Sequence, residues 1–279
     1  MKKFIDILRF IKNREKLINE YKKIGQQELV QKLKAHDLFS KISETSEQDI
    51  FIVGFPKSGN TWMQSIVSGL LYCMDTSLLP DKLAQEIVPD VHARSFYKRF
   101  TKFNFFKSHL LPQKQYKRVI YIVRDGKDAL ISYYFFLKDL GSKVSLDSII
   151  KNGDELFPSF WHIHVNEWLE NRYHSDIIYI RYEDLLISPM EELKKICKFA
   201  GLERSDEILK MVINGNSFEK MKEKAKNFDG VGHINWLGEK GVKFFRNGKI
   251  GDHKNHMTEE QIEFFNNLSK KELQKFNYL

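Results

Sequence analysis

Residues 50–62 read Ile-Phe-Ile-Val-Gly-Phe-Pro-Lys-Ser-Gly-Asn-Thr-Trp, and this stretch predicts a strand, a loop and the start of a helix. Gly54 and Gly59 have the spacing of the phosphate-binding P-loop, G-x-x-x-x-G-K-[ST], in which backbone N–H groups hold phosphates. Asn60 occupies the lysine position of that pattern, while a lysine appears earlier, at Lys57. The loop therefore predicts a nucleotide with a shorter 5′ chain than a triphosphate.

Working outward, β-rich runs recur along the chain and helical patterns separate most of them. The expected strands are Ile50–Val53, Phe103–Phe106, Val119–Val123 and Ile177–Ile180, and the expected helices include Trp62–Met74, Lys127–Leu137, Phe160–Tyr173, Met190–Phe199 and Glu259–Lys275. Alternation of strands and helices is typical of βαβ units. Runs rich in Val, Ile, Tyr and Phe suit strands covered on both faces. We predict an α/β fold with a central parallel sheet flanked by helices on both faces.

The chain of 279 residues is interpreted as a single domain, residues 1–279, although two domains remain possible at this length. Residues 1–48 are expected to be an N-terminal helical segment that packs on the domain, with an amphipathic helix on a membrane surface as the alternative. Residues 227–254 are rich in Gly, Lys, Asn and aromatic residues, which favours a lid loop within the domain over a disordered tail. Thr258 and Gln261 form a capping-box pattern before the last helix.

The composition limits the kinds of partner, cofactor and compartment that are expected for this protein. The chain has 45 basic and 37 acidic residues, so its net charge is +8, which favours an anionic partner or simply reflects solvated helices. Cys73 and Cys197 lie in apolar helical patterns, which indicates small buried hydrophobes and a reducing compartment. We expect no metal, no secretory signal peptide and no membrane-spanning helix, since no metal-ligand spacing and no apolar run of about 20 residues occurs.

Polar residues follow each predicted strand, and each group contains a cation. The cations are Lys57, Lys107, Arg124 and Arg181. Ligands of open parallel sheets bind beyond the carboxyl ends of the strands. Four such groups at one edge predict a pocket for an anionic ligand.

Individual residues in these groups allow two interpretations each. Arg124 and Ser132 could meet a second phosphate, or Arg124 could pair with Asp125 or Asp128 and leave Ser132 on the surface. His109 follows a strand and suits a general base near neutral pH, although a histidine at a sheet edge can also be structural.

Trp62 and a glycine-rich segment also allow two interpretations each. Trp62 could stack on a base or belong to the core. The segment Phe245–Asp252 resembles a basic lid, in which Arg246 could pair with phosphate and Gly248 could let the backbone approach, or it is a surface loop.

Several segments, in order along nearly the whole chain, are similar to the motifs of one family, the cytosolic-type, 3′-phosphoadenosine 5′-phosphosulfate (PAPS)-dependent sulfotransferases. These segments are Phe55-Pro-Lys-Ser-Gly-Asn-Thr-Trp62 (family pattern PKSGTTW), Lys107-Ser-His-Leu110 (K-T-H-L), Val123–Tyr134, Tyr182-Glu-Asp184 (Y-E-D) and Phe244–Asn255 (RKGxxGDWKN). The resemblance implies a P-loop-like phosphosulfate-binding loop and transfer of a sulfuryl group from PAPS.

The resemblance also implies roles for residues. His109, Lys57, Lys107 and Ser132 would be catalytic, and 3′,5′-adenosine bisphosphate (PAP) would be the product. The expected donor-binding residues are Lys57, Ser58, Gly59, Asn60 and Thr61 at the 5′-phosphosulfate, Arg124, Ser132, Arg246 and Gly248 at the 3′-phosphate, and Trp62, Tyr182, Ser217 and Phe218 at the adenine, with Phe245 and Asn247 beside them. The implied acceptor is a hydroxyl or amine of a small, apolar or aromatic molecule in a cytoplasmic enzyme.

The chain departs from the family patterns at a few positions. Asn60 and Ser108 replace threonines, Asn247 replaces a lysine and His253 replaces a tryptophan. The family's dimer motif, K-x-x-x-T-V-x-x-x-E, is matched by Lys254, Thr258 and Glu263, but Glu259 stands in place of its valine. A charge at an apolar contact predicts a monomer or a weak homodimer.

Acceptor identity is the least determined property. Aromatic residues in segments that resemble the family's acceptor site are Phe96, Tyr97, Phe100, Phe103, Phe135, Phe136, Trp236 and Phe244. They favour a flat or apolar acceptor, such as a phenol or a hydrophobic alcohol, or several of them belong to the core, and a carbohydrate or lipid headgroup is a further alternative. Two other functions compete with sulfuryl transfer: a P-loop nucleotide kinase, which should carry a lysine at position 60, and a non-catalytic nucleotide-binding protein. No nucleic-acid-binding motif is present, so we expect no nucleic acid partner.

Overall fold

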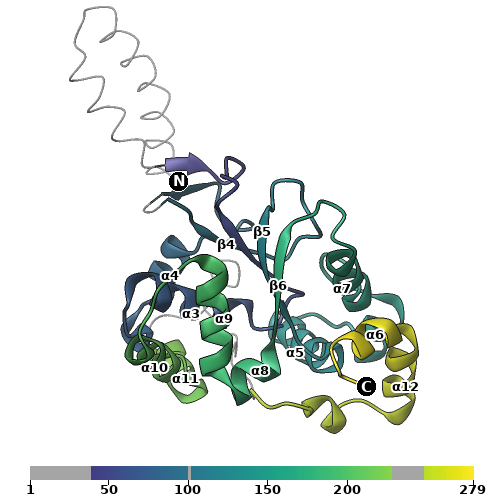
Figure 1. The fold of residues 1–279 in the computed structure, drawn as a ribbon. Coiled ribbons are helices and arrows are strands. Elements are labelled where there is room, and N and C mark those ends of the chain that lie inside the picture. The colour runs from purple at the N-terminus through teal and green to yellow at the C-terminus, as the bar shows by residue number, and fades with distance from the viewer. Residues whose placement is uncertain (1–38, 100–101, 228–247) are drawn as a thin grey trace, which may run out of the picture.

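The computed structural model describes residues 39–99, 102–227 and 248–279 (Figure 1). Its centre is a parallel sheet in the order β4-β2-β5-β6. These strands are β2 (Ile50–Val53), β4 (Phe105–Ser108), β5 (Arg118–Val123) and β6 (Asp176–Arg181). Each strand predicted from the sequence is therefore confirmed, with ends shifted by one or two residues. Ile50 pairs with Phe105 on one side and with Arg118 on the other.

Helices cover both faces of this sheet (Figure 1). One face carries α3 (Asn60–Tyr72), α4 (Asp81–Ile87), α9 (Pro189–Ala200), α10 (Asp206–Gly215) and α11 (Phe218–Asn227). The other face carries α5 (Gly126–Asp139), α6 (Leu146–Asn152), α7 (Trp161–Glu170), α12 (Glu259–Leu268) and α13 (Lys270–Lys275). The short helices η1 (Thr76–Leu78), α8 (Tyr182–Ile187) and η3 (Asp252–Asn255) link these elements.

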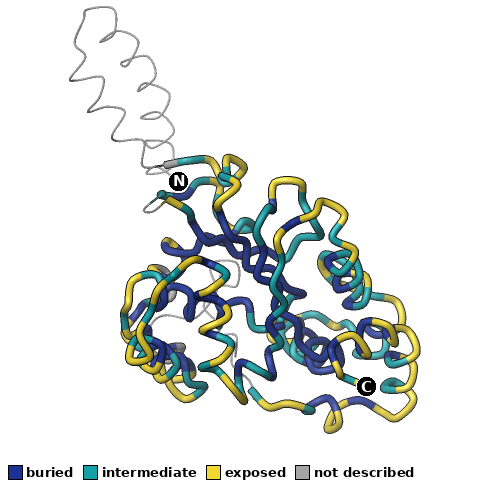
Figure 2. The backbone as a smooth tube through the Cα atoms, in the orientation of Figure 1, coloured by how far each residue is buried: buried dark blue, intermediate teal, exposed yellow. Residues whose placement is uncertain are grey.

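Strand periodicity explains how one sheet supports two cores. Side chains of successive residues point to opposite faces of a strand. In β2, Ile50 and Ile52 pack with α3 and α9, whereas Phe51 and Val53 pack with α5 and α7. All four are at most 1% exposed. β2, β4 and β5 are accordingly mostly dark blue in Figure 2, whereas the edge strand β6 is mostly teal. The predicted α/β class with helices on both faces is confirmed, whereas the single-domain interpretation of residues 1–279 stays a prediction.

A second, two-stranded antiparallel sheet was not expected. It consists of β1 (Phe39–Lys41) and β3 (Phe96–Lys98). The hydroxyl of Tyr97 donates to the carbonyl of Glu44 (2.8 Å), which fixes this sheet against the loop before β2. Of the predicted N-terminal helical segment, residues 1–48, the described residues 39–48 contain β1 and no helix. Residues 1–38 lie outside the described residues, so the helical character of that part stays a prediction.

Local signals set several helix ends. Thr258 and Gln261 form the predicted capping box at the start of α12. The expected last helix, Glu259–Lys275, is interrupted at the buried Ser269 and forms α12 and α13. Cys197 is buried as predicted, but Cys73 is exposed because α3 ends at Tyr72 and Cys73 takes a left-handed conformation beyond it.

Other features frame the start of α5. Asp125 caps this helix by accepting from the Lys127 N–H (2.9 Å), and its own N–H donates to Glu183 Oε1 (3.1 Å). The second oxygen of Glu183 accepts from the hydroxyl of Tyr278 (2.6 Å). A residue near the end of the chain therefore supports the junction of β5 and α5. Among the described residues, no helix has the length and apolar character needed to cross a membrane.

The close packing at Gly126 generates a stability prediction. A Cβ atom there would lie 2.5 Å from the rings of Trp161 and Phe265, which are both at most 2% exposed. We expect Gly126→Ala to lower the free energy of unfolding by about 1–3 kcal/mol, measured by urea denaturation. Gly141→Ala is the control, because its Cβ would meet no atom within 4 Å and only its positive φ costs energy, about 1–2 kcal/mol. A Gly126 variant that unfolds like wild type would contradict the packing argument.

Candidate active site

The loop between β2 and α3 has the geometry of an anion cradle. Gly59 takes a left-handed conformation (φ 104°), and a Cβ there would lie 2.9 Å from the ring of Tyr182. Ser58 is fully buried, and its hydroxyl has no hydrogen-bond partner among the described residues. Helix α3 begins at Asn60, so the free N–H groups of its first turn lie at this loop. Such a terminus attracts phosphate or sulfate.

Positive charge gathers beside the loop. Burial, followed by the charges of Lys107 and Arg124, lowers the pKa of Lys57 to about 7. The Lys57 ammonium lies over the ring of Phe136, 4.7 Å from its centroid. An anion bound among these cations would favour the charged form of Lys57 again and raise its pKa.

Lys107 belongs to a buried ion pair that was not predicted. Its Nζ lies 3.0 Å from Asp90 Oδ2, and both side chains are at most 7% exposed. The same Nζ donates to the Thr61 hydroxyl (3.2 Å), at the start of α3. Asp90 thus neutralises the charge of Lys107 and directs its ammonium towards the loop after β2.

Arg124 occupies the end of β5 as predicted. Its Nη1 donates to the carbonyl of Lys57 (3.1 Å), and its guanidinium lies over the ring of Tyr182 at 4.6 Å. Among the described residues it forms no ion pair, so the alternative pairing with Asp125 or Asp128 is not found. Its buried Nε has no partner there either. Both features leave the guanidinium available to an anionic ligand.

Asp128 instead holds the segment after residue 247. Its Oδ1 accepts from the N–H of His253 (2.9 Å) and lies 2.7 Å from His253 Nδ1, while its Oδ2 accepts from the N–H of Gly251 (2.7 Å). Burial alone would raise the pKa of Asp128, but the bonds with His253 outweigh it and lower the pKa. These hydrogen bonds hold Gly251 and His253 against α5, and Gly248 lies three residues before Gly251.

Ser132 lies half-buried on α5, one turn before Phe136. Residues four apart share a helix face. The predicted catalytic serine therefore lies on the flank of α5 that meets Lys57.

The residues expected at the adenine come together from distant parts of the chain. The rings of Trp62 and Tyr182 meet edge to face with centroids 5.5 Å apart, and the indole N–H of Trp62 donates to the carbonyl of Asn216 (2.8 Å). A Cβ at Gly248 would lie 2.5 Å from the Phe218 ring, so these two also touch. Ser217, between Asn216 and Phe218, completes the group. Trp62 is thus not enclosed in the core.

His109 follows β4 and reaches the loop. Its Nδ1 lies 2.9 Å from the carbonyl of Gly54 and 3.1 Å from Asn60 Nδ2. Asn60 Nδ2 donates to the Gly54 carbonyl (3.1 Å) and to that of Ser108 (3.3 Å). Because the two amide hydrogens of Asn60 have the carbonyls of Gly54 and Ser108 as acceptors, we assign the His109 proton to Nδ1, which leaves Nε2 unprotonated. Burial and then the charge of Lys107 lower the pKa of His109 to about 3. His109 is only partly buried, which moderates this shift, and the imidazole is neutral at pH 7 in either case.

Two further histidines surround His109 and were missed by sequence reasoning. The His109 N–H donates to Nε2 of His92 (3.0 Å), and Nε2 of His164 lies 3.0 Å from the His109 carbonyl. Nδ1 of the fully buried His164 accepts from the hydroxyl of Tyr121 (2.8 Å). Burial lowers the pKa of His164 to about 4. No motif marks these positions, and only the helical position of His164 pointed to a buried residue.

Three of the five described aromatic residues that were expected at the acceptor lie elsewhere: Phe96, Tyr97 and Phe103. Tyr97 is buried in the core beside Phe106, and Phe103 packs against Phe105 at the start of β4, which is the opposite end of the sheet from the loop. Phe96, in β3, belongs to the same region. Of the described members of this set, Phe136 lies below the Lys57 ammonium, whereas the ring of Phe135 meets that of His256, 5.0 Å between centroids.

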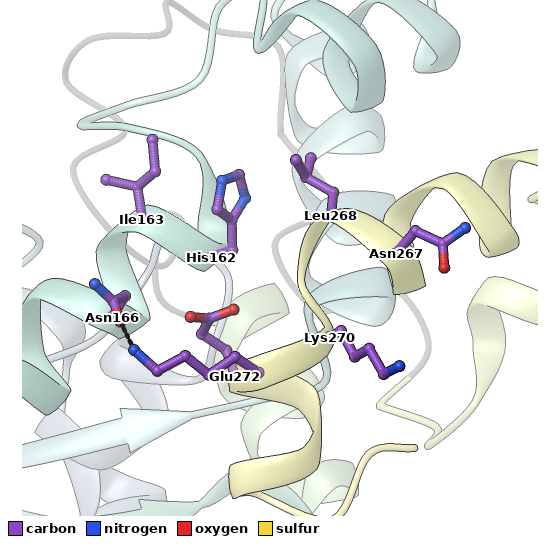
Figure 3. A pocket seen from close by; sticks show the side chains of 8 residues that line it. His162, Ile163, Asn166, Asn267, Leu268, Lys270 and Glu272 are labelled. Atoms are coloured by element: carbon purple, nitrogen blue, oxygen red, sulfur yellow. Dashed lines mark hydrogen bonds between the residues drawn. The ribbon is translucent and has the colours of Figure 1, made fainter.

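A surface pocket of about 440 Å³ lies away from this edge (Figure 3). It is formed by α7, α13 and the end of α12, and its lining includes His162, Asn166, Leu268 and Glu272. None of its residues was predicted to be functional.

Some predicted residues cannot be placed. Phe100, Trp236, Phe244, Phe245, Arg246 and Asn247 lie outside the described residues. Within the described ranges, no cluster of three or more His, Cys, Asp or Glu side chains could hold a metal ion.

Comparisons with known proteins agree on one family. The family model described as the sulfotransferase domain matches residues 47–277. Mouse sulfotransferase 1A1 is 31% identical over 271 residues, covering 84% of this chain and 90% of that protein, and human sulfotransferase 1C2 is 28% identical over 252 residues, covering 83% and 85%. A crystal structure of a mouse sulfotransferase complexed with PAP is 26% identical, with a TM-score of 0.64, covering 82% of this chain and 86% of that one. Retinol dehydratase, 20% identical with a TM-score of 0.62 and 82% coverage of both chains, shares the fold.

The Asp90–Lys107 pair generates a second prediction. Removing one partner of a buried pair leaves an uncompensated charge, whereas replacing both by apolar groups is tolerated better. We expect Asp90→Leu to lower the free energy of unfolding by about 3–5 kcal/mol and the double variant Asp90→Leu/Lys107→Met to recover at least half of that loss. Urea denaturation of both variants measures the difference. If the loss in the double variant equals the sum of the losses in Asp90→Leu and Lys107→Met, the two side chains do not interact.

His164 predicts how stability depends on pH. The folded protein keeps His164 neutral down to about pH 4, whereas the unfolded chain takes up the proton near pH 6.5. The unfolded state therefore binds more protons in this window, and stability falls as the pH drops from about 6.5 to about 4, by up to about 1.4 kcal/mol per pH unit. Urea unfolding at pH 7 and pH 5 should show a shallower dependence in His164→Gln than in wild type. Identical slopes would contradict the assignment.

Proposed function

The chain belongs to the sulfotransferase family, and we propose that it transfers the sulfuryl group of PAPS to a hydroxyl or amine of a small acceptor with His109 as general base. It is a sulfotransferase of the EC 2.8.2 type, as the match to residues 47–277 and the 31% identical relative indicate. The observation that carries the proposal is the meeting of Lys57, Lys107 and His109 at the ends of β2 and β4. There the Gly54 carbonyl links the loop directly to the imidazole.

The residues present fit the donor. The loop leaves no room for a side chain at Gly59, and the buried Ser58 hydroxyl and Arg124 Nε lack partners among the described residues. Buried polar atoms are normally satisfied, so unpartnered ones at an anion cradle suit a phosphate or sulfuryl oxygen. PAPS supplies an activated sulfuryl group attached to its 5′-phosphate.

We assign the donor contacts as follows. Lys57, Ser58, Gly59, Asn60 and Thr61 would hold the 5′-phosphosulfate, Arg124 and Ser132 the 3′-phosphate with Gly248, and Trp62, Tyr182, Ser217 and Phe218 the adenine. Support comes from the paired contacts of Trp62 with Tyr182 and of Gly248 with Phe218. Arg246, Asn247 and Phe245 remain predictions from the resemblance.

His109 is the proposed general base. Its Nδ1–H is engaged by the Gly54 carbonyl, so the unprotonated Nε2 is left to take the acceptor's proton. The acceptor oxygen or nitrogen forms its bond to sulfur as the bond from sulfur to the phosphate oxygen breaks, and PAP leaves with that electron pair. The low pKa of His109 keeps the ring ready as a base at neutral pH, although it also makes the ring a weaker base than an exposed histidine.

Lys57 and Lys107 are proposed to stabilise the charge that grows on the transferred group and the leaving phosphate. Thr61 and Asp90 direct the Lys107 ammonium towards the loop. Lys57 rests over Phe136 in this structure, on the flank of α5 that carries Ser132. Moving from this ring to the donor would bring its charge to the reacting phosphate.

The alternative nucleotide kinase has less support. A P-loop kinase needs a lysine at position 60 to reach the β/γ-phosphates. Asn60 instead donates to the carbonyls of Gly54 and Ser108, a role in the frame of the loop.

The acceptor is proposed to be a small apolar or aromatic alcohol, phenol or amine. Phe136, below the Lys57 ammonium, supports this class. No metal is assigned a role, because lysines and N–H groups supply the positive field.

Sulfate transfer to a panel of phenols and hydrophobic alcohols tests the proposal. We expect turnover with PAPS in the presence of EDTA, and a loss of about 10²–10⁴-fold in kcat for His109→Ala. His174→Asn, at an exposed histidine in a turn, is the matched control and should keep wild-type turnover. Near-wild-type kcat in His109→Ala would rule out the general base.

Donor binding can be tested separately by thermal unfolding. PAP should raise the Tm in a concentration-dependent way, because a ligand stabilises the state that it binds, and ADP should raise it much less. Arg124→Leu, which keeps an apolar contact with Tyr182, should weaken the PAP effect. Equal stabilisation by ADP and PAP would contradict a pocket for a 3′-phosphate.

A further inference from the structure

The peptide group of His109 lies where the main-chain ladder of the sheet ends. β4 is the edge strand of the sheet, and residues 89–91 pair with its outer side. The N–H of Lys107 donates to the carbonyl of Pro89 (2.9 Å), and the carbonyl of Lys107 accepts from the N–H of Val91 (3.0 Å). If this parallel ladder continued, the N–H of His109 would donate to the carbonyl of Val91.

The ladder does not continue, because the chain turns away after Val91. The N–H groups of Ala93 and Arg94 both donate back to the carbonyl of Asp90 (3.1 and 3.0 Å). The side chain of His92 takes the place of the missing backbone acceptor, and its Nε2 accepts from the N–H of His109 (3.0 Å). An imidazole thus ends the ladder at the residue that carries the proposed base.

We infer that His92 is a positioning residue for sulfuryl transfer, which holds the main chain of His109 so that its imidazole stays on the Gly54 carbonyl. This inference rests on the proposed role of His109. The carbonyl of His109, in the next peptide unit, is held by His164, whose Nε2 lies 3.0 Å from it. With its main-chain N–H, its carbonyl and Nδ1 all engaged, His109 has a fixed ring direction, and Nε2 is the nitrogen left for the acceptor's proton.

The hydrogen bond that His92 accepts determines its tautomer. A nitrogen that accepts the His109 N–H must be unprotonated, so neutral His92 carries its proton on Nδ1. The main-chain N–H of His92 donates to Asp90 Oδ1 (2.8 Å), and Asp90 pairs with Lys107. The short segment Asp90–His92 therefore contacts two proposed catalytic residues, Lys107 of β4 and His109 directly after it, and contains none itself.

Packing is the competing role for His92. Its ring is stacked on that of His109, with centroids 5.6 Å apart, and meets Phe157 edge to face at 5.4 Å. Two substitutions separate the roles. The variant His92→Gln keeps a side-chain acceptor near the position of Nε2 but loses the ring, whereas His92→Phe keeps the ring but loses the acceptor.

Steady-state kinetics provides the first test. We expect His92→Phe to lose about 10–100-fold in kcat, because a displaced base has this effect, and His92→Gln to stay within about threefold of wild type. PAP affinity should change less than about twofold in both variants, since His92 is proposed to act through the main-chain N–H of His109, which is assigned to the acceptor's proton and not to donor binding. A His92→Phe enzyme with wild-type kcat, or a larger loss in His92→Gln than in His92→Phe, would overturn the inference.

A second measurement does not need turnover. In protein labelled with ¹⁵N-histidine, exchange of the His109 amide proton reports its hydrogen bond. We expect protection in wild type and His92→Gln and exchange at least about tenfold faster in His92→Phe, with circular dichroism verifying the fold of each. Equal protection in all three proteins would overturn the inference. Altered exchange together with absent wild-type turnover would instead contradict the proposed function and leave the main-chain contact established.

Discussion

The parallel register of β2 and β4 pairs Val53 with Ser108, so both strands end at the same level. The loop after β2 and the histidine after β4 therefore begin side by side. This is what allows the Gly54 carbonyl to meet the His109 ring at 2.9 Å. Because a shift of one residue would turn every side chain of a strand to the other face, the two hydrophobic cores fix the register. Burial on both faces of the sheet thus determines the geometry of the site.

Electrostatics adds a second constraint at the same edge. Lys57, Lys107 and Arg124 lie close enough for their charges to disfavour protonation of Lys57, and the Asp90 carboxylate pairs with Lys107. Repulsion among buried cations is costly in a medium of low dielectric constant. A multiply charged anion relieves it, so the energy that destabilises the free site contributes to the binding of the donor.

The sequence predicted the parts of this protein that depend on local pattern. The strands, the capping box at Thr258 and the meeting of polar residues at the strand ends follow from periodicity and from the rule for parallel sheets. Asp90 and His92 could not be predicted, because their roles come from the pairing of residues 89–91 with an edge strand that follows more than ten residues later. Aromatic composition was equally uninformative at Tyr97, since core packing and acceptor binding favour the same side chains.

The contact of Tyr278 with Glu183 affects the order in which contacts form as the chain is synthesised and folds. Glu183 holds the N–H of Asp125, which caps the helix that follows β5. Its remaining oxygen gains the Tyr278 hydroxyl only when residue 278 has been translated. Domains tend to acquire structure as the chain emerges from the ribosome. The junction of β5 and α5 therefore gains its full set of hydrogen bonds only after residue 278 has joined the fold.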